Sequence, residues 1–159
     1  MSDVGFGSHD HTACMSGALD AAENVCQTRG LRLTKGRRRV LEILLMEHRA
    51  MGAYDILDVM ALEGYAAQPP VVYRALDFLV SHGFAHKIQK LNAYLACTHP
   101  CGDHAPIFLI CHACGTVAET SMPMKASLGA AAKQLGFTIE TTVVEAEGLC
   151  PACSGETPS

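Results

Sequence analysis

Apolar residues recur every three to four positions through the first half of the chain, which predicts a series of amphipathic helices. Thr34 and Pro70 are typical helix starts, and Gly30, Gly64 and Gly83 are typical stops. The predicted helices cover residues 16–29, 35–48, 53–63 and 71–82. The segment before residue 16 is rich in Gly, Ser, Asp and His, and we expect it to be a loose tail.

The apolar period changes after Gly83. The segment "FAHKIQKLNAYLAC" alternates loosely on both sides of "KLN", which predicts a β-hairpin with its turn near Leu91 and Asn92. Helices followed directly by a two-stranded hairpin are typical of a winged helix-turn-helix. In that fold residues 71–82 form the recognition helix that enters the DNA major groove, and the hairpin is the wing.

The second half mixes element types. We predict strands over residues 106–110 and 116–120, a helix over 124–135, and one long alternating strand over 137–146. The fold class is therefore α+β. The expected domains are a flexible tail (1–15), a winged-helix domain (16–96), a hinge (97–105) and a small α/β domain (106–159). A domain as small as the last buries little by itself, so it needs a metal, a partner subunit or both.

Composition and charge indicate the class of protein and its cellular compartment. Of the 159 residues 49% are hydrophobic and 18% are charged, which indicates a globular protein. Neither a signal peptide nor a stretch long enough to span a bilayer is recognisable, so we expect a cytoplasmic protein without a membrane partner. Eight cysteines in a reducing compartment favour metal binding over disulfides. The net charge is −4, yet "RGLRLTKGRRR" carries six basic residues and no acid. This run is either a solvated helix face or a phosphate-binding patch.

Two CxxC pairs form the strongest chemical signal. They predict a closed, four-thiolate structural zinc site made by Cys111, Cys114, Cys150 and Cys153. A pair of redox dithiols is the alternative. His112, between the first two cysteines, is expected to be an exposed bystander. Other candidate ligands remain after these four are assigned, and spacing alone does not choose among them: His86, Cys97, His99, Cys101, His104 and Glu119.

Several segments resemble a known family. "AYDILDVM", "PPVVYRALDFLVSHGFAHK", "NAYLAC", "CHACGTVAE" and "VVEAEGLCPAC" are similar to the ferric-uptake-regulator superfamily and, more closely, to its zinc-uptake-regulator (Zur) branch. The resemblance covers residues 16–153. It implies a bacterial repressor that binds double-stranded operator DNA as a homodimer when loaded with zinc and represses zinc-uptake genes. It also implies an α/β domain that dimerises, and it implies neither an enzyme nor a small-molecule substrate.

The resemblance assigns residues as well. The structural zinc of the family matches the same four cysteines, and its regulatory site matches His86, Cys97, His104 and Glu119, which implies two zinc ions per protomer. The thiolate of Cys97 favours zinc over ferrous iron. The family's base-reading residues match Tyr54 and Arg74. We assign phosphate contacts to the following residues: Arg32, Lys35, Arg37, Arg38 and Tyr73. Arg39 is expected to face solvent.

Alternatives remain within and outside the family. A regulator of the same fold that responds to another metal or to peroxide is the main one. A zinc enzyme needs an open coordination position for water, and four protein ligands leave none. The pair His99 and Cys101 departs from the family pattern, and the tail adds His9, His11 and Cys14. These residues form either a third, weak metal site or an exposed surface.

Overall fold

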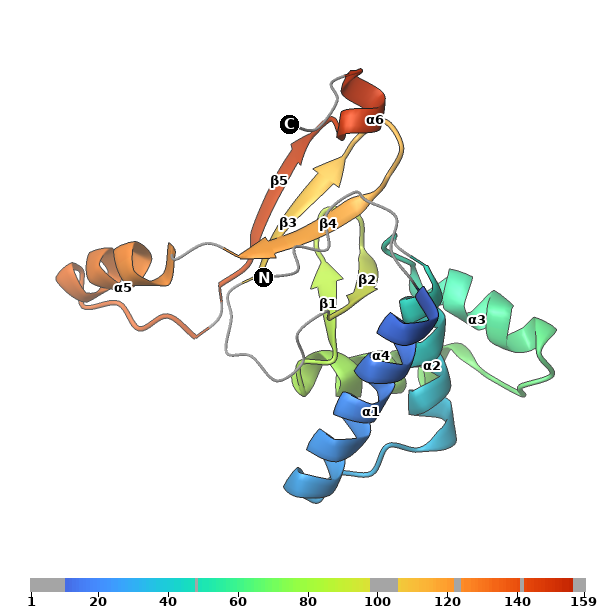
Figure 1. Ribbon diagram of the computed structural model, residues 1–159. Helices are drawn as coiled ribbons and strands as arrows, with labels where there is room; N and C mark the ends of the chain where they lie inside the picture. Colours follow the sequence, from blue (N-terminus) through green and yellow to red (C-terminus); the bar gives the residue numbers. More distant parts are fainter. Residues whose placement is uncertain (1–10, 48, 98–105, 122–123, 141, 156–159) are drawn as a thin grey trace. The chain divides into compact units, whose positions relative to one another are not determined.

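The computed structural model describes residues 11–47, 49–97, 106–121, 124–140 and 142–155, which form two compact units (Figure 1). The first unit lies within Ser8–Gly102, and the second unit includes Asp103–Ser159. No helix among the described residues is long and apolar enough to cross a bilayer. The first unit has four helices and a hairpin: α1 (His11–Arg29), α2 (Lys35–Met46), α3 (Ala53–Leu62), α4 (Pro69–Ser81), β1 (Ala85–Ile88) and β2 (Ala93–Ala96).

Local signals explain most helix boundaries. The side chain of Thr34 caps α2 by accepting a 3.3 Å hydrogen bond from the backbone N–H of Arg37, as predicted. Prolines occupy the first turn of α4, where a missing N–H costs nothing, although the helix begins at Pro69, two residues before the predicted start. α1 starts at His11 and not at residue 16. Residues 11–15 contain neither Gly nor Pro, so nothing in them stops the helix, and the predicted tail was too long.

The hairpin forms as predicted. β1 and β2 pair in antiparallel fashion from Ala85 opposite Ala96 to Ile88 opposite Ala93. Asn92 in the turn has φ 46°, a left-handed conformation that asparagine tolerates better than most residues. A bridge between Met51 and Tyr94, with hydrogen bonds of 2.9 and 2.7 Å, ties the hairpin to the loop before α3. The wing is thus fixed to the helices of its own unit.

The core of the first unit is mainly aliphatic, as the low aromatic content predicted. Every helix contributes one buried face, because apolar residues recur at helical spacing. Completely buried side chains include Ile43, Leu44, Ile56, Met60, Leu76, Leu79 and Phe84. The opposite faces of α3 and α4 are polar or exposed, which leaves them available for a partner.

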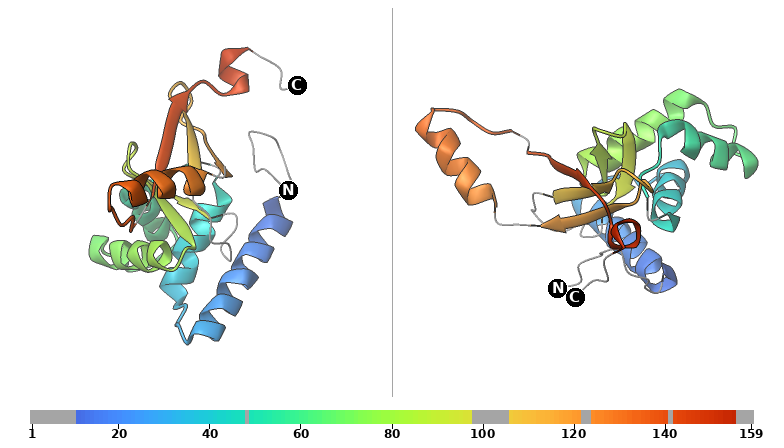
Figure 2. Two further views of the ribbon diagram at one scale, coloured as in Figure 1. Left: turned by 90° about the vertical axis from the view of Figure 1, so that its left-hand side faces the viewer. Right: turned by 90° about the horizontal axis from the view of Figure 1, so that it is seen from above.

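The second unit contains a three-stranded sheet and two helices: β3 (Pro106–Cys111), β4 (Val117–Ser121), α5 (Met124–Gln134), β5 (Val144–Gly148) and α6 (Pro151–Ser154). β3 lies in the middle of the sheet (Figures 1 and 2). It pairs with β4 in antiparallel fashion and with β5 in parallel. The parallel pair needs a long connection, which α5 supplies.

The predicted strand over residues 137–146 is wrong in its first part. β5 begins only at Val144, and the described residues before it form no strand. Val144 lies opposite Ile107, next to the first residue of β3, so the preceding residues have no neighbouring strand in the sheet. Alternation predicts which face a residue would occupy, but backbone hydrogen bonds decide where a strand exists. Phe137 and Val143 are left exposed.

Gly36 weakens α2 without any structural need. A Cβ added there meets no atom within 4 Å, and its φ is not positive. Gly36→Ala is therefore expected to raise the free energy of unfolding by about 0.5–1 kcal/mol, because alanine loses less backbone entropy on folding. Urea denaturation of the zinc-loaded protein measures this change.

Gly30 provides a matched control for that substitution. A Cβ there also meets no atom within 4 Å, but φ is +66°. Gly30→Ala should lower the free energy of unfolding by about 1 kcal/mol, because a left-handed conformation is unfavourable for a residue with a Cβ. If both substitutions change the free energy of unfolding in the same direction, backbone entropy and φ do not explain the effects at the two glycines.

Candidate functional site

The four cysteines of the CxxC pairs come together at one end of the second sheet. Cys111 ends β3, Cys114 lies in the turn after it, Cys150 is the N-cap of α6, and Cys153 lies within α6. Their sulfur atoms all lie within 4.8 Å of one another. The parallel pairing of β3 and β5 brings the two pairs together, because it places Cys111 opposite Gly148, two residues before Cys150. This closes the long gap between the pairs in the sequence.

The sulfur geometry fits a tetrahedral metal. Zn–S bonds of about 2.3 Å at tetrahedral angles place two sulfur atoms about 3.8 Å apart. The Sγ atoms of Cys114 and Cys150 are 3.7 Å apart. Four thiolates leave no open position for water, so the site suits a structural ion and not a catalytic one.

Backbone N–H groups prepare the site for anionic sulfur. The N–H of Cys150 donates to Sγ of Cys111 at 3.4 Å, and with the N–H of Cys114 it lowers the pKa of Cys111 to about 6. The hydroxyl of Thr116 lies 3.2 Å from Sγ of Cys114, and this contact has the largest effect in lowering the pKa of the Cys114 thiol. Contacts with the other sulfur atoms, Cys150 first, raise the pKa of Cys153 to about 12. A divalent cation would neutralise the negative charge of these closely spaced thiolates.

His112 takes part in this region through its backbone. Its N–H donates a 3.0 Å hydrogen bond to the carbonyl of Gly148, which ties the first CxxC turn to the end of β5. The residue is exposed, in line with its expected role as a bystander.

The predicted regulatory ligands are divided between the two units. His86 in β1 is half-buried, Cys97 directly after β2 is 2% exposed, and their ligand atoms lie within 4.8 Å of each other. The N–H of Cys97 donates a 2.9 Å bond to the carbonyl of Phe84, which fixes the position of this residue at the end of the wing. Glu119 lies in β4 of the second unit and is buried. His104 lies outside the described residues, as do His9, His99 and Cys101.

The predicted base-reading residues lie on exposed helix surfaces of the first unit. Tyr54 is 64% exposed in the first turn of α3. Arg74 is exposed on α4, whose opposite face is buried through Val72 and Leu76. Tyr73 is 40% exposed beside Arg74. The exposed side chains that could reach DNA thus project from α3 and α4, and the opposite faces of these two helices are fixed in the core.

The cations of the basic run differ in their surroundings. Arg32 and Lys35 are exposed, and among the described residues the structure records no ion pair for either. Arg38 pairs with Glu23 of α1 and with Glu42, the latter at 3.0 Å. Arg37 lies over the ring of Phe78. The predicted phosphate contacts therefore include two exposed side chains and two that are engaged within the protein.

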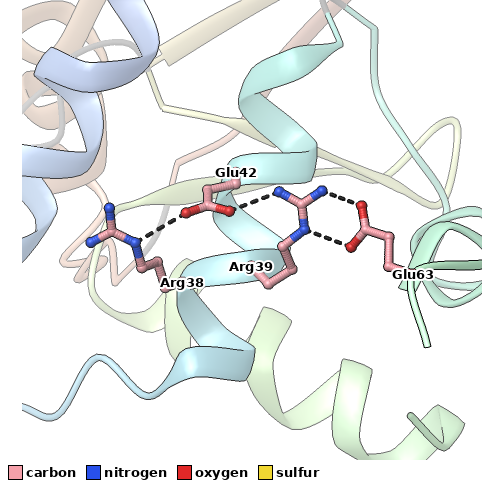
Figure 3. Close-up of polar contacts among 4 residues, drawn as sticks. All are labelled: Arg38, Arg39, Glu42 and Glu63. Atoms are coloured by element: carbon pink, nitrogen blue, oxygen red, sulfur yellow. Dashed lines mark hydrogen bonds and ion pairs between the residues drawn. The ribbon is translucent and has the colours of Figure 1, made fainter. Parts of the chain in front are cut away.

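Arg39 does not face solvent as expected. It bridges α2 to the end of α3 by two contacts with Glu63, one of them 2.7 Å long, and it pairs with Glu42 at 2.8 Å (Figure 3). The hydrogen bonds from Arg39 hold the pKa of Glu63 below its usual value. The spacing of Arg39 and Glu42 at i,i+3 could have predicted that pair. The sequence holds no comparable signal for Glu63.

These observations define a class: a winged-helix protein joined to a small α/β domain with a four-cysteine metal centre. A sequence profile of the Ferric uptake regulator family matches residues 28–147, and the chain belongs to that family. The chain is 39% identical over 139 residues to the Zinc uptake regulation protein of Escherichia coli, a match that covers 85% of this chain and 80% of the relative. It is 31% identical over 147 residues to the Transcriptional regulator FurA of Mycobacterium tuberculosis, covering 88% and 94%.

Solved structures agree with this membership. A zinc uptake regulator complexed with zinc and DNA matches with a TM-score of 0.85 at 37% identity, covering 89% of this chain and 95% of that one. The crystal structure of holo XcZur matches with a TM-score of 0.80 at 40% identity, covering 86% and 96%. The ferric uptake regulator Fur of Helicobacter pylori, at 18% identity and a TM-score of 0.56, shares the fold. The expected fold class and family are confirmed.

Proposed function

We propose that this protein is a zinc-responsive transcriptional repressor. When loaded with zinc it binds operator DNA as a homodimer and represses genes for zinc uptake. The observation that supports this best is the similarity to a zinc uptake regulator complexed with zinc and DNA, which extends over 89% of the chain and thus includes both units. A regulator of this kind acts on DNA in the cytoplasm and needs neither a catalytic centre nor a small-molecule substrate.

Two zinc ions per protomer fit the ligands. The four-cysteine cluster is the structural site, and zinc there supplies folding free energy that the small second unit lacks. His86, Cys97, His104 and Glu119 are the proposed regulatory ligands. Their N, S and O donors suit a tetrahedral ion, and the thiolate of Cys97 selects zinc over harder metals such as ferrous iron or manganese. The remaining candidates for a weaker third site are His99, Cys101, His9, His11 and Cys14.

DNA recognition follows from the exposed side chains of the first unit. Arg74 on α4 is suited to a bidentate contact with guanine, and Tyr54 is the second base-reading residue. Exposed Arg32 and Lys35 are the phosphate contacts that need no rearrangement of the protein. Tyr73 stays a phosphate contact, and Arg38 can serve as one only in addition to its ion pairs with Glu23 and Glu42.

The homodimer is supported by the apolar surface of the second unit. Of the described α5 side chains between residues 126 and 134 only Ala132 is buried. A groove of about 390 Å³ there is lined mostly by apolar residues: Leu128, Ala131, Ala132, Leu135, Phe137, Ile139, Thr142 and Val143. A second copy of the chain is the occupant we propose. It would cover Leu135 and Phe137, which are 84% and 67% exposed.

Metal-titrated DNA binding tests the proposal against a regulator for another metal. The full-length protein, with its structural zinc retained, is titrated with buffered free zinc, ferrous iron or manganese, and DNA binding is measured by fluorescence anisotropy. The probe is a duplex that the zinc-loaded protein selects from a random-sequence library. We expect zinc to induce binding at far lower free concentrations than iron or manganese. Half-maximal binding at lower free iron or manganese would assign the protein to the alternative.

A further inference from the structure

The guanidinium of Arg37 is engaged inside the first unit. Its Cζ lies 3.9 Å from the centre of the Phe78 ring, and its Nη1 donates a 2.7 Å hydrogen bond to the backbone carbonyl of Arg32. A cation so close to an aromatic face is attracted by the negative charge of that face. Arg37 therefore connects three segments: α2, the loop before it, and α4.

Phe78 belongs to the proposed recognition helix and follows Arg74 by four residues. Residues with this spacing lie on the same side of a helix, one turn apart. The ring of Phe78 also contacts the rings of His82 and Phe84, with centroids 4.6 and 6.4 Å away. Phe78 thus lies where α4 meets the start of the wing, on the same side of α4 as Arg74.

The space between α2 and α4 is incompletely filled near Arg74. Arg37 and Arg74 both line a pocket of about 180 Å³, together with Thr34, Gly36 and Val71. This groove lies at the surface, and the buried faces of α2 and α4 still hold the two helices together in the core. The contact between Arg37 and Phe78 adds a further fixed point between α2 and α4 outside that core.

We propose that Arg37 is a positioning residue for DNA recognition. It holds α4 at a fixed distance from α2 and thereby aims Arg74 at the base edges, instead of contacting a phosphate itself. The inference rests on the proposed DNA-binding function. It divides the basic run by role: the exposed side chains of Arg32 and Lys35 meet the phosphates, while Arg37 is used within the protein.

Base discrimination and salt dependence together test this role. The full-length, zinc-loaded protein is titrated with the duplex that it selects from a random library, with single-base variants of that duplex, and with random-sequence duplex. Arg37→Ala is expected to weaken binding to the selected duplex about 2- to 30-fold, the range that a cation–π contact implies. Discrimination should fall at the same base pairs at which Arg74→Ala reduces it.

Phe78→Leu removes the aromatic partner without changing charge. It should reduce discrimination at the same base pairs as Arg37→Ala. The losses of the two single variants should be less than additive in the double variant, because both changes remove the contact that Arg37 and Phe78 share. If Arg37→Ala does not fold, Phe78→Leu alone carries the test, since a phosphate contact by residue 37 does not require an aromatic ring at residue 78.

Lys35→Ala is the matched control, since it removes one positive charge from the same turn of α2. It should weaken binding to selected and random DNA equally and reduce the slope of log K against log salt by about 0.9, the value for one lost phosphate contact. The slope for Arg37→Ala should equal that of the wild type. The proposal is overturned if Arg37→Ala behaves like Lys35→Ala, or if Phe78→Leu discriminates like the wild type. A wild-type protein that selects no duplex would instead contradict the proposed function.

Discussion

Replacing Cys111 with serine is expected to release one zinc ion per protomer and to unfold the second unit. Serine is a poor zinc ligand, and three thiols do not complete a closed site. Structural zinc contributes about 10–16 kcal/mol in small zinc-binding peptides, which is of the same size as the roughly 5–15 kcal/mol that stabilises a typical domain. Zinc content by mass spectrometry, far-UV circular dichroism and gel filtration of the full-length chain measure the loss.

The packing of the second unit explains why this effect should be so large. Its sheet buries few large side chains, chiefly Ile107, Phe108 and Ile110. The described face of α5 is almost fully exposed, so this helix adds little to the core. A unit with so small a core relies on its metal for stability.

Cys97→Ser provides the contrast. Cys97 is as well buried as Cys111, but it belongs to the first unit, whose larger core does not include the four-cysteine site. The variant should keep the structural zinc and remain a folded dimer. Equal zinc contents and equal stabilities for Cys111→Ser and Cys97→Ser would show that the division into a structural and a regulatory site is wrong.

The start of α2 and the four-cysteine cluster were predictable because their signals are local. Thr34 caps the helix that begins at the next residue, and each CxxC pair is contained in one turn. Only the closing of the gap between the two pairs required the fold, through the parallel pairing of β3 and β5. The hairpin was predictable for the same reason, since its turn residue Asn92 is part of the local pattern.

The partners that lie far from the arginines in the sequence were not predictable. Glu63 follows Arg39 by 24 residues, and Phe78 lies in a helix that α2 meets only in the folded protein. Six basic residues in one run look equivalent in a sequence, although their neighbours give them different roles. The first part of the predicted strand over residues 137–146 failed because the described residues before Val144 have no neighbouring strand in this sheet. Alternation within one sequence does not show whether a neighbouring strand exists.

A loss of zinc response without a loss of folding is the second large effect we expect. At saturating zinc, Cys97→Ser should bind the selected duplex about as weakly as wild-type protein that lacks regulatory zinc. Allosteric couplings of about 1–3 kcal/mol correspond to a 5- to 150-fold change in affinity. The proposed ligands come from both units, so zinc would select arrangements of the two units that are competent for DNA. Anisotropy titrations at buffered free zinc measure the change.

Two further variants separate this effect from simple damage to the protein. His86→Gln removes the ligand that faces Cys97 in the first unit and should produce the same loss, whereas His112→Ala removes an exposed histidine next to the structural site and should leave the response intact. Wild-type affinity for DNA in Cys97→Ser at saturating zinc would refute the regulatory role. Thermodynamic linkage adds a reciprocal requirement. The selected duplex must raise the affinity of the regulatory site for zinc by the same factor by which zinc raises the affinity of the protein for DNA. Because Cys97→Ser and His86→Gln lack that site, DNA should leave their remaining zinc affinity unchanged.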